Sequence, residues 1–341
     1  SNYCMEKEKE VYDGKSFTLY KVLDTRKNRI LCKKVLKYNP EVQDPTQEEM
    51  QEACKRLEIL HAIHHPSIRG IIGISAENEY LKDCLIGNND IQQNLDDHAI
   101  ETELNEPNSN DNDSNDDEVQ IVEKEVEQIN NDNEDDSTSE KNNPFIKLPP
   151  KSELFLEFME QSLKDYIVTN PSHTLKARIA VEIASGMMHL HRLGMVHGNL
   201  RVNNIMLNSV YEAKIIDFSQ LQILQQFETK LVPSRFSLDD EILNEKIRND
   251  VFGYGKILYY IFSGKHFEDF ESLAQLTPSD LMTQFCIDLV KQCLSVDPSQ
   301  RPTFEEILNQ IRDHSFALAS DVNSDIVERR YKVLEKFNSF M

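Results

Sequence analysis

A strongly acidic segment divides this sequence into two parts and limits how the chain can fold. The stretch from Ile91 to Asn142 holds 18 carboxylates and two lysines, a net charge of −16 out of −22 for all 341 residues. Asn, Asp, Glu and Ser dominate it, and such a composition buries too little apolar surface to offset the entropy lost on ordering. We therefore predict a disordered acidic insert over residues 87–147. Within it, the stretch Val119–Ile129 has apolar residues at helical spacing.

The remainder of the chain has an ordinary globular composition and carries a net charge of only −6 (−22 minus −16). The overall acidity argues against nucleic acid and anionic membranes as partners. No apolar run reaches the ~20 residues that a membrane span needs. The six cysteines are scattered without a CxxC pair, which argues against a zinc ribbon and a disulfide-rich secreted fold. We therefore expect a cytoplasmic protein with free thiols.

Apolar patterns differ on the two sides of the insert. Before it, two β-like runs at 17–23 and 29–36 are followed by an amphipathic helical stretch at 46–63. After it, one strand-like run at 154–159 precedes several long helical stretches. These helical stretches are residues 175–193, 249–264, 280–294 and 303–313. A small β-rich part followed by a larger helical part predicts an α+β fold.

The predicted boundaries follow from these patterns. They are a first part at 1–86, the insert at 87–147, a strand and helical part at 148–320, and a helical C-terminal tail at 321–341. We expect the insert to connect the fourth and fifth strands of the β-rich part. Such an insertion costs little, because loop-closure entropy grows only logarithmically with loop length.

Two short motifs stand close together in the second part. Residues 195–207 read MVHGNLRVNNIML, and residues 213–220 read AKIIDFSQ after a gap typical of a hairpin. They resemble the protein-kinase catalytic loop H-R-D-L-x-x-x-N and the metal-binding D-F-G triplet. The matching residues are His197, Leu200, Asn204, Asp217 and Phe218.

Four further segments resemble protein kinases in the expected order. Residues 64–74 are similar to the turn after the regulatory helix, and residues 154–163 to the hinge. Residues 249–264 resemble the helix whose aspartate, here Asp250, anchors the catalytic loop. Residues 293–308 resemble the late segment whose arginine, here Arg301, has a structural role. In their residues, these segments resemble the tyrosine-kinase-like group of protein kinases more than other groups.

The resemblance implies a bilobal protein-kinase-like fold with a small β-rich N-lobe and a larger helical C-lobe. It also implies ATP and Mg²⁺ as candidate cofactors. The implied nucleotide-binding residues are Gly14, Leu19, Cys32, Lys34, Glu157, Met159, Asn204, Met206 and Asp217. Of these, Asn204 and Asp217 are the candidate metal ligands, and Lys34 is the candidate catalytic lysine. Lys33 takes its place if the alignment slips by one residue.

The histidines are interpreted as structural. By analogy with the family, His197 packs under Phe218 rather than acting in catalysis. A cluster of His61, His64 and His65 lacks the spacing of metal ligands, so we expect it to form a helix end and turn.

Departures from the kinase pattern concern the catalytic residues. Asn199 stands where an active kinase has the aspartate that accepts the proton of the substrate hydroxyl, and an amide has no basic site at neutral pH. Gly198 replaces the motif arginine, and Ser219 replaces the glycine of D-F-G.

The phosphate-binding loop is also degenerate. Its three glycine positions are Tyr12, Gly14 and Phe17, so only the middle glycine remains. Backbone amides approach phosphates closely where a Cβ is absent, so we expect weak phosphate binding by this loop. The regulatory-helix glutamate falls on Arg56 by spacing, with Glu52 and Glu58 as alternatives.

These observations predict a pseudokinase, an ATP-binding or allosteric signalling module that recruits or regulates a protein partner. Two alternatives stay open. One is a weak or atypical kinase that transfers phosphate from Mg-ATP to a protein hydroxyl. The other is a nucleotide-free protein-binding scaffold.

Overall fold

The computed structural model describes residues 5–13, 17–25, 27–37, 46–75, 152–218, 221–223 and 241–339. The predicted acidic insert, the stretch Val119–Ile129 and Gly14 lie outside these ranges. The described chain falls into two compact units, and each is described by itself. The first unit lies within Ser1–Ala62 and Ile71–Phe158, and the second within Ile63–Gly70 and Met159–Met341.

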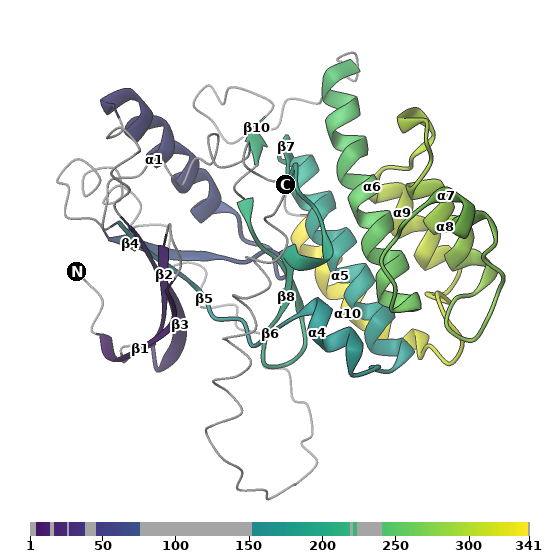
Figure 1. The fold of residues 1–341 in the computed structure, drawn as a ribbon, viewed down its shortest axis with the longest axis horizontal. Coiled ribbons are helices and arrows are strands. Elements are labelled where there is room, and N and C mark those ends of the chain that lie inside the picture. The colour runs from purple at the N-terminus through teal and green to yellow at the C-terminus, as the bar shows by residue number, and fades with distance from the viewer. Residues whose placement is uncertain are drawn as a thin grey trace, which may run out of the picture. The chain divides into compact units, whose positions relative to one another are not determined.

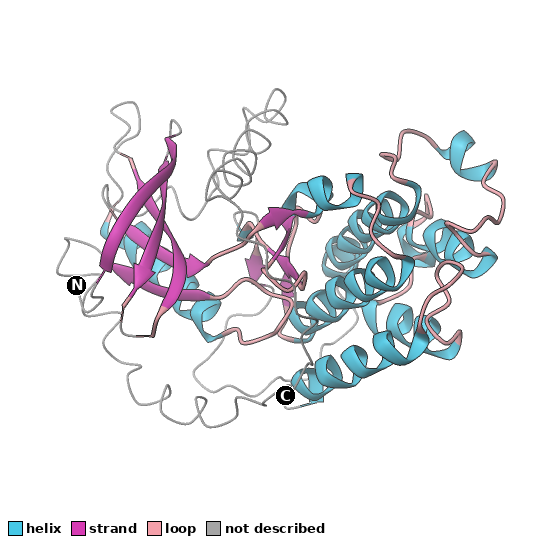
Figure 2. Cartoon of the chain, turned by 90° about the horizontal axis from the view of Figure 1, so that it is seen from below, coloured by secondary structure: helices cyan, strands magenta, loops and turns pink. Residues whose placement is uncertain are grey.

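A five-stranded antiparallel sheet forms the first unit (Figure 2). Its strands are β1 (Met5–Asp13), β2 (Phe17–Asp24), β3 (Arg29–Leu36), β4 (Ile71–Ser75) and β5 (Glu153–Glu157). They are ordered β1-β2-β3-β5-β4. Because β4 ends at Ser75 and its antiparallel neighbour β5 starts at Glu153, the acidic segment connects two adjacent strands.

Both faces of this sheet carry apolar side chains. Leu19 and Cys32 form a buried cluster on one face. Val22, Leu31 and Phe155 form a second cluster. Since successive side chains of a strand point to opposite faces, the two clusters cover the two sides of β2 and β3.

Helix α1 (Gln47–Ala62) completes the first unit and confirms the helix predicted at 46–63. It begins with a reciprocal cap, in which the Thr46 hydroxyl accepts from the Glu49 amide at 3.3 Å and the Glu49 carboxylate accepts from the Thr46 amide at 3.0 Å. At its other end, His61 Nδ1 lies 2.6 Å from the Ile71 carbonyl oxygen. The predicted structural role of His61 is thereby confirmed.

Helices dominate the second unit (Figure 1). Its elements are β6 (Gln161–Ser162), α4 (Leu163–Val168), α5 (His173–Arg192), β7 (Met195–Val196), η6 (Val202–Asn204), β8 (Ile205–Leu207), β9 (Ala213–Ile215), β10 (Gln222–Ile223), α6 (Glu241–Ser263), α7 (Phe270–Ala274), α8 (Gln284–Cys293), η8 (Pro298–Gln300), α9 (Phe304–Asp313) and α10 (Ser324–Ser339). The α+β segregation predicted from the apolar patterns is confirmed. None of the described helices combines the length and the apolar content that crossing a bilayer requires.

Helix α6 differs from its prediction because it begins at Glu241 rather than at residue 249. Residues 241–248, EILNEKIR, contain neither Gly nor Pro, so nothing in them stops the helix. At Gly253 the helix passes directly beneath the Leu200 carbonyl, where a Cβ would collide with that oxygen. Glycine is therefore required for α6 to pack against the motif at 195–207.

Helix α10 packs along α5 (Figure 1). Its buried side chains are Val327, Tyr331, Leu334 and Asn338. The predicted C-terminal helix therefore exists, and it covers the second unit.

Two buried histidines lie between α5 and the segment Ile63–Gly70. The rings of His65 and His189 have centroids 4.9 Å apart. His65 Nδ1 accepts from the Ser67 amide at 3.0 Å, which confirms the predicted turn. Burial lowers the pKa of His65 to about 2 and the pKa of His189 to about 4.

Acid should therefore destabilise the second unit. Because the pKa of His189 is lower in the folded chain than its ordinary 6.5, the unfolded chain binds the proton first, and stability falls as the pH drops below 6.5. Between pH 7 and pH 5, His189 alone should cost about 2 kcal/mol of unfolding free energy. Urea unfolding at both pH values measures this cost. Between pH 7 and pH 5, the unfolding free energy of His189→Gln should fall less than that of the wild type, by about the amount that His189 costs. Equal losses in the two proteins would contradict this account.

Candidate functional site

Asp250 of α6 holds the loop that follows β7. Its carboxylate accepts hydrogen bonds from the backbone amides of His197 and Gly198, both at 2.9 Å, and lies 2.9 Å from His191 Nε2. Gly198 has φ +78°, a left-handed conformation that glycine adopts without cost. The predicted anchoring role of Asp250 is confirmed.

His197 is fully buried and has a packing role, as predicted. Its Nε2 lies 3.0 Å from the Ile216 carbonyl oxygen, and its Nδ1 accepts from the Asn199 amide at 3.2 Å. Its ring meets the Phe218 ring edge-on with centroids 5.4 Å apart. Since Nε2 must donate and Nδ1 must accept, this geometry fits the neutral ring with its proton on Nε2.

Asn199, Asn204 and Asp217 come together at the open end of the β8–β9 hairpin. Asn204 Nδ2 donates to the Asn199 carbonyl at 2.7 Å, and Asn199 Nδ2 donates to Asp217 Oδ2 at 3.5 Å. Asp217 has φ +62°, a left-handed conformation that is uncommon outside glycine and is found at functional sites. A neutral amide thus faces the Asp217 carboxylate.

Met159 and Met206 lie together in the second unit. They form one buried cluster with Ile216, next to Asp217 in the chain. The Glu160 amide donates to the Leu207 carbonyl at 2.9 Å and ties the segment after Met159 to β8. Two of the implied nucleotide-binding residues, Met159 and Met206, are therefore neighbours.

In the first unit, Leu19, Cys32 and Lys34 share one face of the sheet. Lys34 pairs with Leu19 of β2, and Cys32 pairs with Leu156 of β5. Lys33 lies on the opposite face, where its Nζ is 3.6 Å from a Glu153 carboxylate oxygen. Of the two lysines, Lys34 is the one that shares a face of the sheet with Leu19 and Cys32.

Phe17 contacts this face in a way that the sequence did not reveal. Its ring packs against the cluster of Leu19 and Cys32. The Lys34 ammonium lies over the ring, 4.0 Å from its centroid, within the range of a cation–π interaction. The Phe17 ring therefore covers one side of the Lys34 ammonium group.

Four further candidates can be placed only in part. Glu157 is the last residue of β5 and pairs with Leu31. The backbone of α1 is described at Glu52 and Arg56, but their side chains lie outside the described set. Glu58 is partly buried, and burial raises the pKa of its carboxyl group.

Arg301 is bound in the second unit through backbone and amide oxygens. Its Nε donates to the Ser295 carbonyl at 2.9 Å, and its Nη1 donates to the Arg248 carbonyl at 3.1 Å and to Asn249 Oδ1 at 3.0 Å. These bonds join the first half of α6 to the turn before α9, which agrees with the predicted structural role of Arg301.

Magnesium at this site would depend on a nucleotide. In the described ranges, no group of three or more His, Cys, Asp or Glu side chains could hold a metal ion. Mg²⁺ is commonly held by one or two carboxylates together with phosphates and water. Asp217 supplies a carboxylate, and Asn204, whose Nδ2 is engaged, offers Oδ1. The residues fit a magnesium ion that arrives with phosphate.

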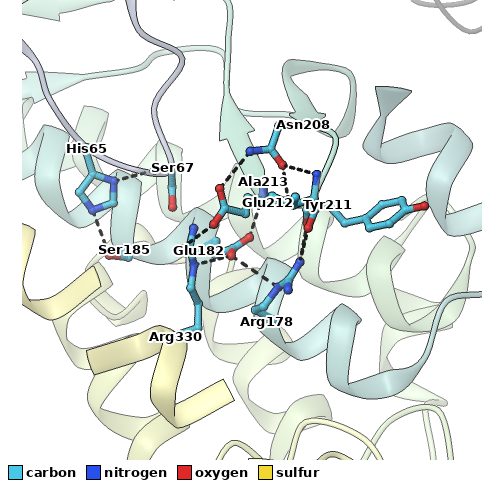
Figure 3. A network of polar contacts seen from close by, with 11 residues as sticks. His65, Ser67, Arg178, Glu182, Ser185, Asn208, Tyr211, Glu212, Ala213 and Arg330 are labelled. Carbon is cyan, nitrogen blue, oxygen red and sulfur yellow. Dashed lines mark hydrogen bonds and ion pairs between the residues drawn. The ribbon is translucent and has the colours of Figure 1, made fainter. Parts of the chain in front are cut away.

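Sequence reasoning missed a buried charged centre on α5. Glu182 is fully buried and forms ion pairs with Arg330 at 2.7 Å and Arg178 at 3.6 Å (Figure 3). The available signal was a single acidic residue within the apolar run IAVEIASGM of residues 179–187. Its main partner on α10 is distant in sequence, so no local pattern points to it.

Comparison with known proteins agrees with this geometry. Residues 10–311 match the family model of protein tyrosine and serine/threonine kinases. The chain is 25% identical over 178 residues to a dual serine/threonine and tyrosine protein kinase of Strongylocentrotus purpuratus, covering 47% of this chain and 19% of that protein. It is 28% identical over 166 residues to the probable serine/threonine-protein kinase kinX of Dictyostelium discoideum, covering 43% and 15%.

A third relative is the dual specificity protein kinase pyk3 of Dictyostelium discoideum. The chain is 31% identical to it over 148 residues, covering 38% of this chain and 11% of that protein. The matched regions thus span less than a fifth of the length of each of these three relatives.

Removing charge from Asp250 should loosen the loop. In Asp250→Asn, one acceptor oxygen becomes an NH₂ group facing a buried N–H donor, which should cost about 3 kcal/mol of unfolding free energy. Asp288→Asn is the matched control, because Asp288 is exposed on α8, and it should change stability by less than about 0.5 kcal/mol. Chemical denaturation measures both. A loss no larger than that of the control would show that Asp250 does not anchor the loop.

Proposed function

Because the chain belongs to the protein tyrosine and serine/threonine kinase family, we propose that it is a kinase domain with impaired catalysis. In this proposal it is a pseudokinase that binds ATP and acts through a protein partner as an allosteric or scaffolding module. The observation that carries the proposal is Asn199 at the base position, with its amide directed to the Asp217 carboxylate at 3.5 Å.

The missing base accounts for weak chemistry. A kinase aspartate accepts the proton of the attacking hydroxyl, whereas the Asn199 side chain can orient that hydroxyl but cannot accept its proton. A positioned base contributes about 10²–10⁴ in rate, which is roughly 3–5 kcal/mol of the barrier. Turnover should therefore fall by that factor even if ATP is held correctly.

The same substitution favours nucleotide binding with less dependence on metal. Two carboxylates side by side repel each other and call for a cation between them. Here the Asn199 amide donates to Asp217, so the local negative charge is lower by one and is partly neutralised by a hydrogen bond. ATP binding with and without Mg²⁺ is thus compatible with the site.

A weak kinase is the second candidate. It is supported by the retained arrangement of Asn204, Asp217 and the buried His197 beneath Phe218. A loose phosphoryl-transfer transition state also demands less of a base than many other reactions.

A nucleotide-free scaffold is the third candidate. It is supported by Phe17, which occupies a glycine position of the phosphate loop and contacts the Lys34 ammonium. A ligand phosphate would have to displace this ring or pass beside it.

Restoring the carboxylate should separate the pseudokinase from the weak kinase. The wild type should be stabilised thermally by ATP, since a ligand at 100 times its dissociation constant adds about 2.7 kcal/mol. It should transfer little or no labelled phosphate to itself or to a generic protein substrate. Asn199→Asp should raise transfer by about 10²-fold or more, because a base returns beside the acceptor.

Asp217→Ala is the control in both assays, and it should abolish any transfer and any Mg²⁺-dependent stabilisation. Robust transfer by the wild type that disappears in Asp217→Ala would overturn the pseudokinase proposal. Absence of any thermal shift at millimolar ATP would instead favour the scaffold.

Phe17→Gly should strengthen nucleotide binding. It restores a glycine to the phosphate loop and removes the ring from Lys34, and losing a cation–π contact of about 1 kcal/mol corresponds to roughly fivefold in affinity. Titration calorimetry with ATP measures the gain.

Tyr20→Leu is the matched control, because it removes a ring that lies 4.8 Å from the Lys33 ammonium on the other face of the sheet. This control should leave ATP affinity unchanged. If the two variants changed ATP affinity equally, or if Phe17→Gly did not raise ATP affinity, Phe17 would not limit access to Lys34.

A further inference from the structure

Arg330 joins the C-terminal helix α10 to two acidic residues of the second unit. Its Nε lies 2.7 Å from Glu182 Oε1, and its Nη1 lies 2.7 Å from Glu212 Oε1 (Figure 3). Glu182 belongs to α5, and Glu212 belongs to the turn between β8 and β9. One guanidinium therefore connects three elements, and α10 lies beyond the family match, which ends at residue 311.

Glu182 favours a docked α10. Burial raises the pKa of its carboxyl group, while the guanidiniums of Arg330 and Arg178 and a backbone bond favour the charged form. Its second oxygen accepts from the Ala213 amide at 2.7 Å. Without α10, this buried carboxylate would keep its longer 3.6 Å ion pair with Arg178 but lose the 2.7 Å ion pair with Arg330, which is destabilising.

Glu212 fixes the turn of the β8–β9 hairpin. Its amide donates to Asn208 Oδ1 at 2.8 Å, and Asn208 Nδ2 donates back to Glu212 Oε2 at 3.0 Å. The Arg178 guanidinium binds the same turn by donating to the Tyr211 carbonyl at 2.8 Å. Arg330 and Arg178 thus hold the hairpin at its closed end.

The open end of this hairpin carries the candidate metal ligands. Asn204 directly precedes β8, and Asp217 follows β9 by two residues. Ile205 pairs with Ile215, and the Ile216 amide donates to the Asn204 carbonyl at 2.9 Å. Two paired strands of three residues each therefore connect the turn to both candidate ligands.

The far end of α10 reaches β9 by a second route. Asn338 Nδ2 donates to Ser185 Oγ at 2.9 Å. Ser185 Oγ in turn lies 3.2 Å from His65 Nε2 (Figure 3). His65 belongs to the segment Ile63–Gly70, whose Ser67 carbonyl accepts from the Ile215 amide at 2.9 Å. Helix α10 is therefore connected to the hairpin at two places, through Arg330 near its middle and through Asn338 near its end.

We propose that α10 is a positioning element of the nucleotide site. Through Arg330 and Glu212 it sets the hairpin that presents Asn204 and Asp217 to a magnesium–phosphate group. The functional kinase unit then extends through Ser339, beyond the family match. This inference rests on the proposed function, so its test includes a measurement that needs no nucleotide.

Glu212→Gln is the decisive variant. Removing the Glu212 charge weakens the link between Arg330 and the hairpin, since a neutral amide oxygen replaces the carboxylate, and it leaves Glu182 paired with Arg330. The thermal midpoint should fall by less than about 3 °C. The Mg²⁺-dependent part of ATP affinity, measured by calorimetry with and without Mg²⁺, should fall about fivefold, while Mg²⁺-free affinity stays unchanged.

Lys332→Gln is the matched control, because it breaks an exposed ion pair with Glu328 on the same helix. Lys332→Gln should change neither the thermal midpoint nor the Mg²⁺-dependent part of ATP affinity. Arg330→Lys keeps a cation for Glu182 but cannot bridge two carboxylates, so it should reproduce the effect of Glu212→Gln.

Hydrogen exchange provides the measurement without nucleotide. The amides of residues 213–216 should exchange about tenfold faster in Glu212→Gln than in the wild type or Lys332→Gln. Unchanged exchange, or an equal loss of Mg²⁺-dependent and Mg²⁺-free affinity, would overturn the positioning role. Faster exchange in a chain that binds no ATP at all would refute nucleotide binding and leave the link between α10 and the hairpin supported.

Discussion

The buried carboxylate of Asp250 is the interaction on which the site depends. By accepting the backbone amides of His197 and Gly198, it fixes the direction in which the chain leaves β7. That direction places the His197 ring against the Ile216 carbonyl and Phe218, and it brings Asn199 to Asp217. Charge-assisted bonds to a buried anion are strong because water does not compete for the donors. The chemistry of the loop therefore follows from an anchor located on α6.

The parts of the site that could be predicted are those governed by short spacing. His197, Asn204 and Asp217 lie within one loop and hairpin, so their separation in sequence determines their arrangement. The start of α6 at Glu241 was missed because the prediction followed the apolar run from residue 249, whereas the first turns of the helix are mostly polar. The ring of Phe17 over Lys34 depends on strand register. The pairing of Glu182 with Arg330 spans 148 residues and depends on how α10 docks.

In the proposed pseudokinase, Asn199 and Phe17 act on different steps. Asn199 lacks the basic oxygen of an aspartate and adds no charge beside Asp217, so in this proposal it affects chemistry and metal dependence. Phe17, whose ring contacts the Lys34 ammonium in the first unit, would instead hinder the approach of phosphate. Asn204 stays bonded to the Asn199 carbonyl because the hairpin and Asp250 maintain the geometry of the loop.

The division of the chain into units that interleave along the sequence has a consequence for biosynthesis. Strand β3 ends at Leu36, yet its neighbour β5 begins only at Glu153, and the segment Ile63–Gly70 bonds to β9 at Ile215. A nascent chain emerging from the ribosome can pair β1, β2 and β3 with one another, but one edge of β3 and strand β4 lack their partner until β5 appears. Non-local pairing of this kind slows folding and leaves strand edges exposed to aggregation. During synthesis, the free edge of β3 and strand β4 are therefore the parts of the sheet most open to misassembly.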